Sequence, residues 1–96
     1  MITLKSAHEI ELMRRAGKIT AAARAVARDM VKPGVTTQQI DKAVFHFIRE
    51  QGAIPSFLHY NGYPASVCIS VNDEIIHGIP GKRVLQEGDI VSVDVG

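Results

Sequence analysis

An aspartate inside a valine-rich segment is the first residue whose setting suggests chemistry. Asp94 lies in Val91-Ser92-Val93-Asp94-Val95, which has the composition of a strand. A carboxylate buried there would need a charge partner, hydrogen bonds or a metal ion, because burying an unpaired charge is costly. Strict alternation gives a second interpretation, in which the valines face the core and Asp94 faces water. The residue pattern by itself favours this exposed aspartate.

A histidine at a predicted bend is the second candidate. His77 follows Ile75-Ile76 and precedes Gly78-Ile79-Pro80, where glycine lets the main chain approach a ligand closely. A neutral imidazole there could donate to a substrate carbonyl or move a proton near pH 7. The alternative is a hydrogen-bonded histidine at a strand end, and the local pattern favours that alternative.

Aromatic side chains and a sulfur surround a predicted loop that contains Gly62 and Pro64. Such a group could line an apolar pocket for an unbranched thioether side chain, because contacts between sulfur and aromatic rings are favourable. Ordinary packing beneath a loop is the alternative, and composition does not exclude it. The residues concerned are Phe57, Tyr60, Tyr63 and Cys68.

A long helix precedes these candidates. Ser6 and Glu9 form a capping box that predicts a helix from Ala7, and the sequence Lys32-Pro33-Gly34 ends it. Small residues fill its middle and predict close packing against a flat surface such as a sheet. The expected buried stripe consists of Ile10, Met13, Ala16, Thr20, Ala23, Ala27 and Met30.

A second helix and several short strands follow. Thr36 and Gln39 form another capping box, which predicts a helix from Thr37 to about Gln51, and Gly52 sits where a helix-ending glycine belongs. Strands are expected at 66–71, 75–77 and 90–95, with turns between them. Two helices followed by an antiparallel strand cluster indicate the α+β class.

Composition sets the outer limits. The 96 residues make one small domain or part of a larger one, and a net charge of +1 gives no argument for nucleic acid or a membrane surface. Cys68 is the only cysteine, so no intrachain disulfide forms. Without a leader-like segment or a long apolar run, the sequence predicts a cytoplasmic protein.

Four segments in this order resemble the type I methionine aminopeptidases, and the resemblance spans essentially the whole chain. They are Tyr60–Pro64, Ser66–Asn72, His77–Pro80 and Gly88–Val95. The resemblance implies the pita-bread α+β fold, in which two similar halves surround a dinuclear metal centre. Residues 1–96 are then expected to be the N-terminal portion of a single metallopeptidase catalytic domain, incomplete at the C-terminus.

The same resemblance implies a reaction and roles for the candidate residues. The family removes the initiator methionine from nascent proteins with two divalent ions, which could be Co, Mn, Fe, Zn or Ni. Asp94 corresponds to the first metal ligand, which reverses the preference given by its local pattern. His77 corresponds to a catalytic histidine that also contacts substrate. Phe57, Tyr60, Tyr63 and Cys68 correspond to positions around the methionine pocket.

The expected partners follow from this family. They are the N-terminus of a nascent peptide that begins with methionine and a small residue, and the ribosome. Only one of the family's five metal ligands is present, so we expect the chain alone to be inactive and to bind metal weakly or not at all. The exposed valine strand then predicts docking with a missing C-terminal half, or self-association. The alternative is a non-catalytic binding module of the same fold, or a truncated gene product.

Overall fold

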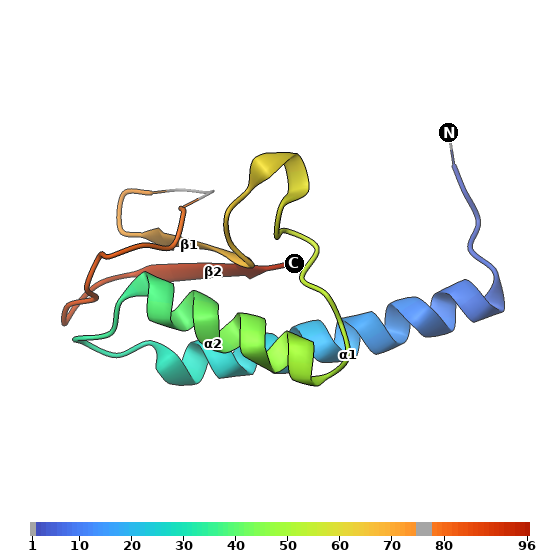
Figure 1. Cartoon of the computed structure of the whole chain (residues 1–96), viewed down its shortest axis with the longest axis horizontal. Coiled ribbons are helices and arrows are strands. Elements are labelled where there is room, and N and C mark those ends of the chain that lie inside the picture. The colour runs from blue at the N-terminus through green and yellow to red at the C-terminus, as the bar shows by residue number, and fades with distance from the viewer. Residues whose placement is uncertain (1, 75–77) are drawn as a thin grey trace.

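The computed structural model describes residues 2–74 and 78–96. Two helices, α1 (Ala7–Met30) and α2 (Thr37–Glu50), form one layer. A two-stranded antiparallel sheet of β1 (Val67–Val71) and β2 (Val91–Val95) forms the other layer (Figure 1). A short 3-10 turn, η1 (Tyr60–Gly62), lies in the loop before β1. The predicted α+β arrangement of two helices on an antiparallel sheet is therefore confirmed.

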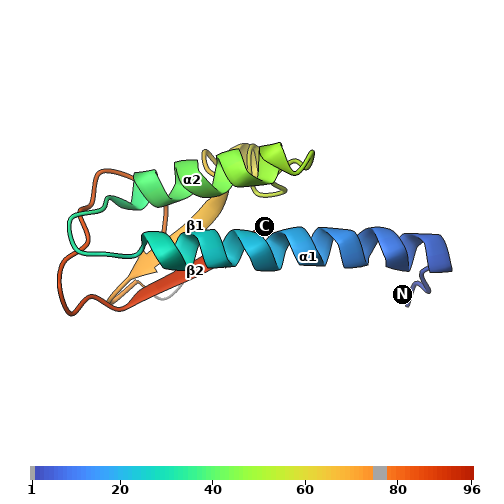
Figure 2. The ribbon, with the colours of Figure 1, turned by 90° about the horizontal axis from the view of Figure 1, so that it is seen from below.

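Helix α1 begins as its capping box predicts. The Ser6 hydroxyl accepts from the Glu9 main-chain N–H at 3.1 Å, and the Glu9 carboxylate accepts from the Ser6 N–H at 2.8 Å. The predicted stripe is buried only in part, because Ala23 and Ala27 are the helical residues that are fully enclosed. The N-terminal half of α1 extends past the sheet (Figure 2). The expectation of a stripe buried along the whole helix is wrong for that half, where Ile10 and Met13 are exposed.

Helix α2 supplies most of the helical contribution to the core. Thr36 and Gln39 form the predicted capping box, and the apolar positions Ile40, Val44 and Ile48 are buried at a spacing of one helical turn. Gly52 has φ of 77°, a left-handed conformation that glycine adopts without strain. The observed end at Glu50 lies within one residue of the predicted one.

The sheet divides its residues between two faces. Val67, Ile69 and Val71 of β1 join the helices in one hydrophobic core, and the three valines of β2 pack against the same core. Cys68 pairs with Asp94 and Ser70 pairs with Ser92, so these four residues share the opposite face. The alternation predicted for β2 is confirmed. The return strand predicted at 75–77 lies outside the described residues.

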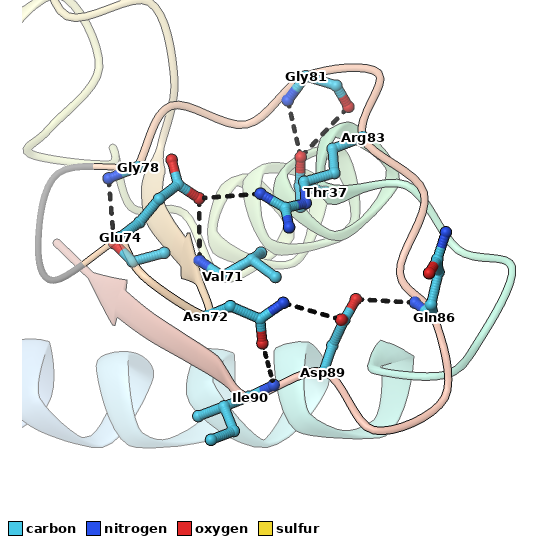
Figure 3. Close-up of polar contacts among 11 residues, drawn as sticks. Thr37, Val71, Asn72, Glu74, Gly78, Gly81, Arg83, Gln86, Asp89 and Ile90 are labelled. Atoms are coloured by element: carbon cyan, nitrogen blue, oxygen red, sulfur yellow. Dashed lines mark hydrogen bonds and ion pairs between the residues drawn. The ribbon is translucent and has the colours of Figure 1, made fainter.

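A long connection joins β1 to β2 and is held to the start of α2. The Leu85 main chain exchanges hydrogen bonds with Gly34 and Val35, both at 2.8 Å. The Thr37 hydroxyl accepts from the Gly81 N–H at 2.8 Å, a contact drawn in Figure 3. Among the helices that the structure describes, none is long and apolar enough to cross a membrane.

Candidate functional site

A pocket of about 560 Å³ lies on the sheet face that carries Cys68 and Asp94. Its volume falls within the range of ordinary small-molecule sites. Residues from the loop before β1, from both strands and from the segment after position 77 meet here. The described lining residues are Phe57, Tyr60, Asn61, Gly62, Tyr63, Pro64, Cys68, Ile79 and Asp94. The structure thus brings together Asp94 and all four predicted pocket residues.

The loop between Phe57 and Tyr63 folds tightly and turns its aromatic side chains into the pocket wall. His59 and Asn61 have left-handed φ values of 66° and 49°, and Gly62 has 79°. Main-chain bonds close the turn on itself, with the His59 N–H donating to the Tyr63 carbonyl at 2.8 Å. The rings of Phe57 and Tyr63 meet edge to face with centroids 6.4 Å apart. These contacts within the loop hold its aromatic side chains in place along one side of the pocket.

Tyr63 is held by its hydroxyl, which donates to the Val67 carbonyl at 2.8 Å. A longer contact of 3.4 Å reaches the Gly78 carbonyl. Burial, and then the nearby Cys68 side chain, raise the pKa of Tyr63 far above its ordinary value. The phenol is protonated at neutral pH and can donate to the Val67 carbonyl, and this hydrogen bond holds the Tyr63 ring at the side of the pocket.

Asp94 stands directly across the strand pair from Cys68. Its residue is exposed, yet it lines the pocket together with Tyr63 and Ile79. The exposed position that alternation predicts for Asp94 is therefore confirmed, and its role as a metal ligand stays a prediction. The aspartate points away from the valine core, as alternation predicts, and the face it points to is the pocket. An exposed carboxylate beside an apolar wall is free to take a cation or a substrate amine.

The predicted catalytic residue His77 lies outside the described residues. The next residue, Gly78, lies within the described part of the chain and is hydrogen-bonded to β1. The Gly78 carbonyl accepts from the Ile69 N–H at 2.8 Å, and the Gly78 N–H donates to the buried Ser70 hydroxyl at 3.1 Å. A Cβ on Gly78 would collide with the Ile69 carbonyl oxygen. Only glycine fits between this segment and the strand.

The fit of these residues to a metal centre is incomplete. Within residues 2–74 and 78–96, no three His, Cys, Asp or Glu side chains gather so that they could hold a metal ion. Asp94 gives the described pocket lining one carboxylate, which is a suitable donor for a divalent ion. The described residues therefore do not build a dinuclear centre by themselves.

Asp41 is a supporting residue that sequence reasoning missed. From α2 its carboxylate accepts from the main-chain N–H groups of Ser66 at 2.8 Å and Val67 at 3.1 Å. These two bonds fix the start of β1, next to the pocket residue Cys68. Burial raises the pKa of Asp41, while the two hydrogen bonds act in the opposite direction. The available signal was an acid directly beside the core residue Ile40.

The fold agrees with a class of metal-dependent peptidases. The sequence of residues 11–96 matches metallopeptidase family M24, and the chain belongs to this family. The named relatives of the chain point to one kind of peptidase within this family. The chain is 49% identical over 96 residues to methionine aminopeptidase 1 of Bacillus subtilis. It is 54% identical over 97 aligned residues to a methionine aminopeptidase of Clostridium acetobutylicum.

Solved structures give the same result. The methionine aminopeptidase of Thermotoga maritima superposes with a TM-score of 0.96 at 43% identity, covering 99% of this chain and 39% of that one. The chain likewise covers 39% of the two bacterial relatives while being aligned over its whole length. The pita-bread fold family expected from the resemblance is thus confirmed. The chain spans about two-fifths of the length of these relatives.

Proposed function

We propose that this chain forms the substrate side-chain pocket, and one part of the metal site, of a methionine aminopeptidase. The enzyme would remove the initiator methionine from nascent proteins. One observation carries the proposal, which is that separate segments bring Phe57, Tyr60, Tyr63 and Cys68 around a single hollow with Asp94 on its wall. The names of the relatives support the same activity.

The pocket wall has the chemistry that a methionine side chain requires. Three aromatic rings and the Cys68 sulfur offer apolar, polarisable contacts to a thioether, and Ile79 adds a further apolar surface. Tyr63 is already hydrogen-bonded to the main chain, so its ring presents no unpaired hydroxyl to the substrate. These residues would therefore exclude water from the pocket and orient the methionine side chain.

Asp94 is proposed as one carboxylate ligand of the metal site. Residues 1–96 would then be the N-terminal portion of a single metallopeptidase domain, with the remaining ligands supplied by further protein. Co, Mn, Fe, Zn and Ni all suit oxygen and nitrogen donors, and the ion is chosen by availability and geometry. His77 is proposed to contact the scissile amide, as its correspondence in the family implies. The substrate would be a nascent N-terminus with methionine before a small residue, met in the cytoplasm near the ribosome.

The test joins this chain to the remaining part of the Bacillus subtilis relative, of which the chain covers 39%. Release of methionine from Met-Ala-Ser is measured with added Co²⁺ or Mn²⁺, and Leu-Ala-Ser serves as the substrate control. We expect methionine release from the joined protein and little release by the chain alone.

Asp94→Asn should lower kcat/KM by at least ~10–100-fold, which is the cost of losing only a residue that hydrogen-bonds to a metal ligand. Ser92→Ala is the matched control, because Ser92 lies on the same strand and the same face. Absence of turnover in the joined protein would refute the proposal and favour a non-catalytic binding module.

A further inference from the structure

The mutual position of β1 and β2 is not set by the connection between them. In a tight hairpin the turn fixes the register of the strands. Here the first residue after β1, Asn72, and the last before β2, Ile90, are 18 positions apart. Gly96, the residue after β2, accepts from the Ser56 and Phe57 N–H groups and so contacts the start of the pocket loop, not β1. Another feature must select the observed register.

Hydrophobic alternation settles only half of this choice. A slip by one residue would turn Asp94 into the valine core, so the pattern opposes it strongly. A slip by two residues keeps every valine on the core face and is not opposed by the pattern. Such a slip would move Asp94 about 7 Å along β1, at roughly 3.3–3.4 Å per residue. It would place Ser92 across from Cys68 and take the carboxylate out of its place in the pocket.

Asn72 contacts β2 in a way that distinguishes these registers. Its main-chain N–H donates to the Ile90 carbonyl at 2.8 Å, and its side-chain Oδ1 accepts from the Ile90 N–H at 2.9 Å. In a regular antiparallel pair a main-chain carbonyl would accept that second bond. Asn72 has φ of 55°, a left-handed conformation that asparagine adopts more readily than most residues. The side chain thus extends the ladder by one pair just as the strand turns away.

Asp89 holds the Asn72 side chain in this orientation. The Asn72 amide Nδ2 donates to Asp89 Oδ1 at 3.0 Å, and Asp89 Oδ2 accepts from the Gln86 N–H at 2.8 Å. Figure 3 shows Asn72 placed between Ile90 and Asp89. Because the amide is bonded at both of its ends, its oxygen is directed at one main-chain N–H of the incoming strand.

We propose that Asn72 sets the register of β1 and β2, and is thereby the positioning residue that places Asp94 in the pocket across from Cys68. The consequence for metal binding rests on the proposed function. The register itself does not, because it is a property of the strands alone.

Cys68 makes the register measurable, since it is the only cysteine in these 96 residues. With Asp94→Cys the two cysteines face each other across the strands, where the Cα separation of about 5.5 Å suits a disulfide. With Ser92→Cys the partner is diagonal to Cys68, at about 7–8 Å, and a disulfide requires the two-residue slip. Rates of disulfide closure in the intact protein are followed by mass spectrometry of the cross-linked peptide.

Asn72→Gly is the decisive variant, because glycine keeps the left-handed conformation and removes only the side-chain bonds. We expect it to slow closure severalfold in Asp94→Cys and to speed closure in Ser92→Cys. Gln86→Ala is the matched control, because the main-chain N–H of residue 86 can still donate to Asp89 Oδ2. It should change neither closure rate. Unchanged closure rates in Asn72→Gly would overturn the proposal.

An exchange of side chains gives a second, independent test should Asn72→Gly fail to fold. In the double variant Asn72→Asp with Asp89→Asn, a carboxylate at position 72 accepts from Ile90 and from the amide at position 89. That amide's oxygen can still accept from the Gln86 N–H, so every bond has a counterpart. Native closure rates in the double variant support the proposal, and rates like those of Asn72→Gly overturn it.

The functional consequence is tested by calorimetric titration with Mn²⁺ of the protein in which this chain is joined to the remaining part of the Bacillus subtilis relative. We expect Asn72→Gly to weaken Mn²⁺ binding at least severalfold, and the exchanged double variant to restore it. Retained Mn²⁺ binding in Asp94→Asn would refute the metal role of Asp94, while the disulfide rates would still decide the register. Failure of the positioning inference and failure of the proposed function are thus separated.

Discussion

Gly78→Ala is expected to destabilise the protein strongly because the site has no room for a methyl group. The new Cβ would collide with the Ile69 carbonyl oxygen and would lie 2.7 Å from its carbonyl carbon and 2.9 Å from Ser70 Cα. All of these are main-chain atoms of β1, so no side chain can move aside. The segment that carries Gly78 must lift away from the strand.

The magnitude follows from the bonds that this movement breaks. Lifting Gly78 separates its carbonyl from the Ile69 N–H and its N–H from the Ser70 hydroxyl. Both partners on β1 are almost fully buried, with 1% and 4% exposure. A buried group left without a partner costs about 1–3 kcal/mol, so two of them give roughly 2–6 kcal/mol. That loss is a large part of the ~5–15 kcal/mol that stabilises a typical protein.

Urea unfolding of Gly78→Ala beside Gly81→Ala measures this difference. A Cβ on Gly81 would meet nothing within 4 Å, and the main-chain bond from its N–H to Thr37 is retained. Gly81→Ala should therefore change the free energy of unfolding by less than about 1 kcal/mol. Equal free energies of unfolding for the two variants would refute the reasoning, because only their surroundings differ.

Three further outcomes can be checked in the same way. Asp41→Ala should lose roughly 2–6 kcal/mol, because two buried main-chain N–H groups lose their acceptor, whereas Asp41→Asn keeps the oxygen and removes the charge. Burial raises the pKa of Asp41 above 3.8, so stability present at low pH is lost as pH rises through the folded pKa. The urea midpoint of the Asn variant should therefore rise relative to that of the wild type as pH increases from below 3.8 to above the raised pKa of Asp41. Tyr63→Phe should lose about 1 kcal/mol with its bond to Val67, measured by thermal unfolding. The hydrogen bond from Asn72 lowers the pKa of Asp89 below 3.8, so its contribution is present above that pH and is lost as pH falls through the folded pKa. In an acid titration followed by circular dichroism, Asp89→Asn should therefore lose less stability than the wild type as pH falls through the folded pKa of Asp89.

The helices and the alternation of β2 could be predicted from local sequence. Ser6 with Glu9 and Thr36 with Gln39 satisfy helix N-termini through residues three positions apart, so their effect needs no distant partner. The valines at alternate positions of β2 likewise determine which side chains meet an apolar layer. Local pattern also gave the correct face of Asp94, but it could not show that this face is a pocket.

The extent of burial on α1 was not predictable in the same way. Ile10 and Ala27 both lie on its apolar stripe, yet one is 46% exposed and the other fully buried. The difference arises because the sheet lies beneath only the C-terminal half of the helix (Figure 2). Periodicity shows which face of a helix can be buried, and the length of the neighbouring layer decides how much of it is.

The sequence by itself determined the positions of both helices and of β1 and β2, which side chains of β2 share a face, and the family to which the chain belongs. Tertiary structure alone decided the contacts between distant positions: Asp41 on the start of β1, Gly78 against Ile69, and Asn72 on Ile90. The physical reason is the distance along the chain over which each interaction acts. Capping and alternation act over a few residues, whereas these contacts depend on how separately formed elements come to rest against one another.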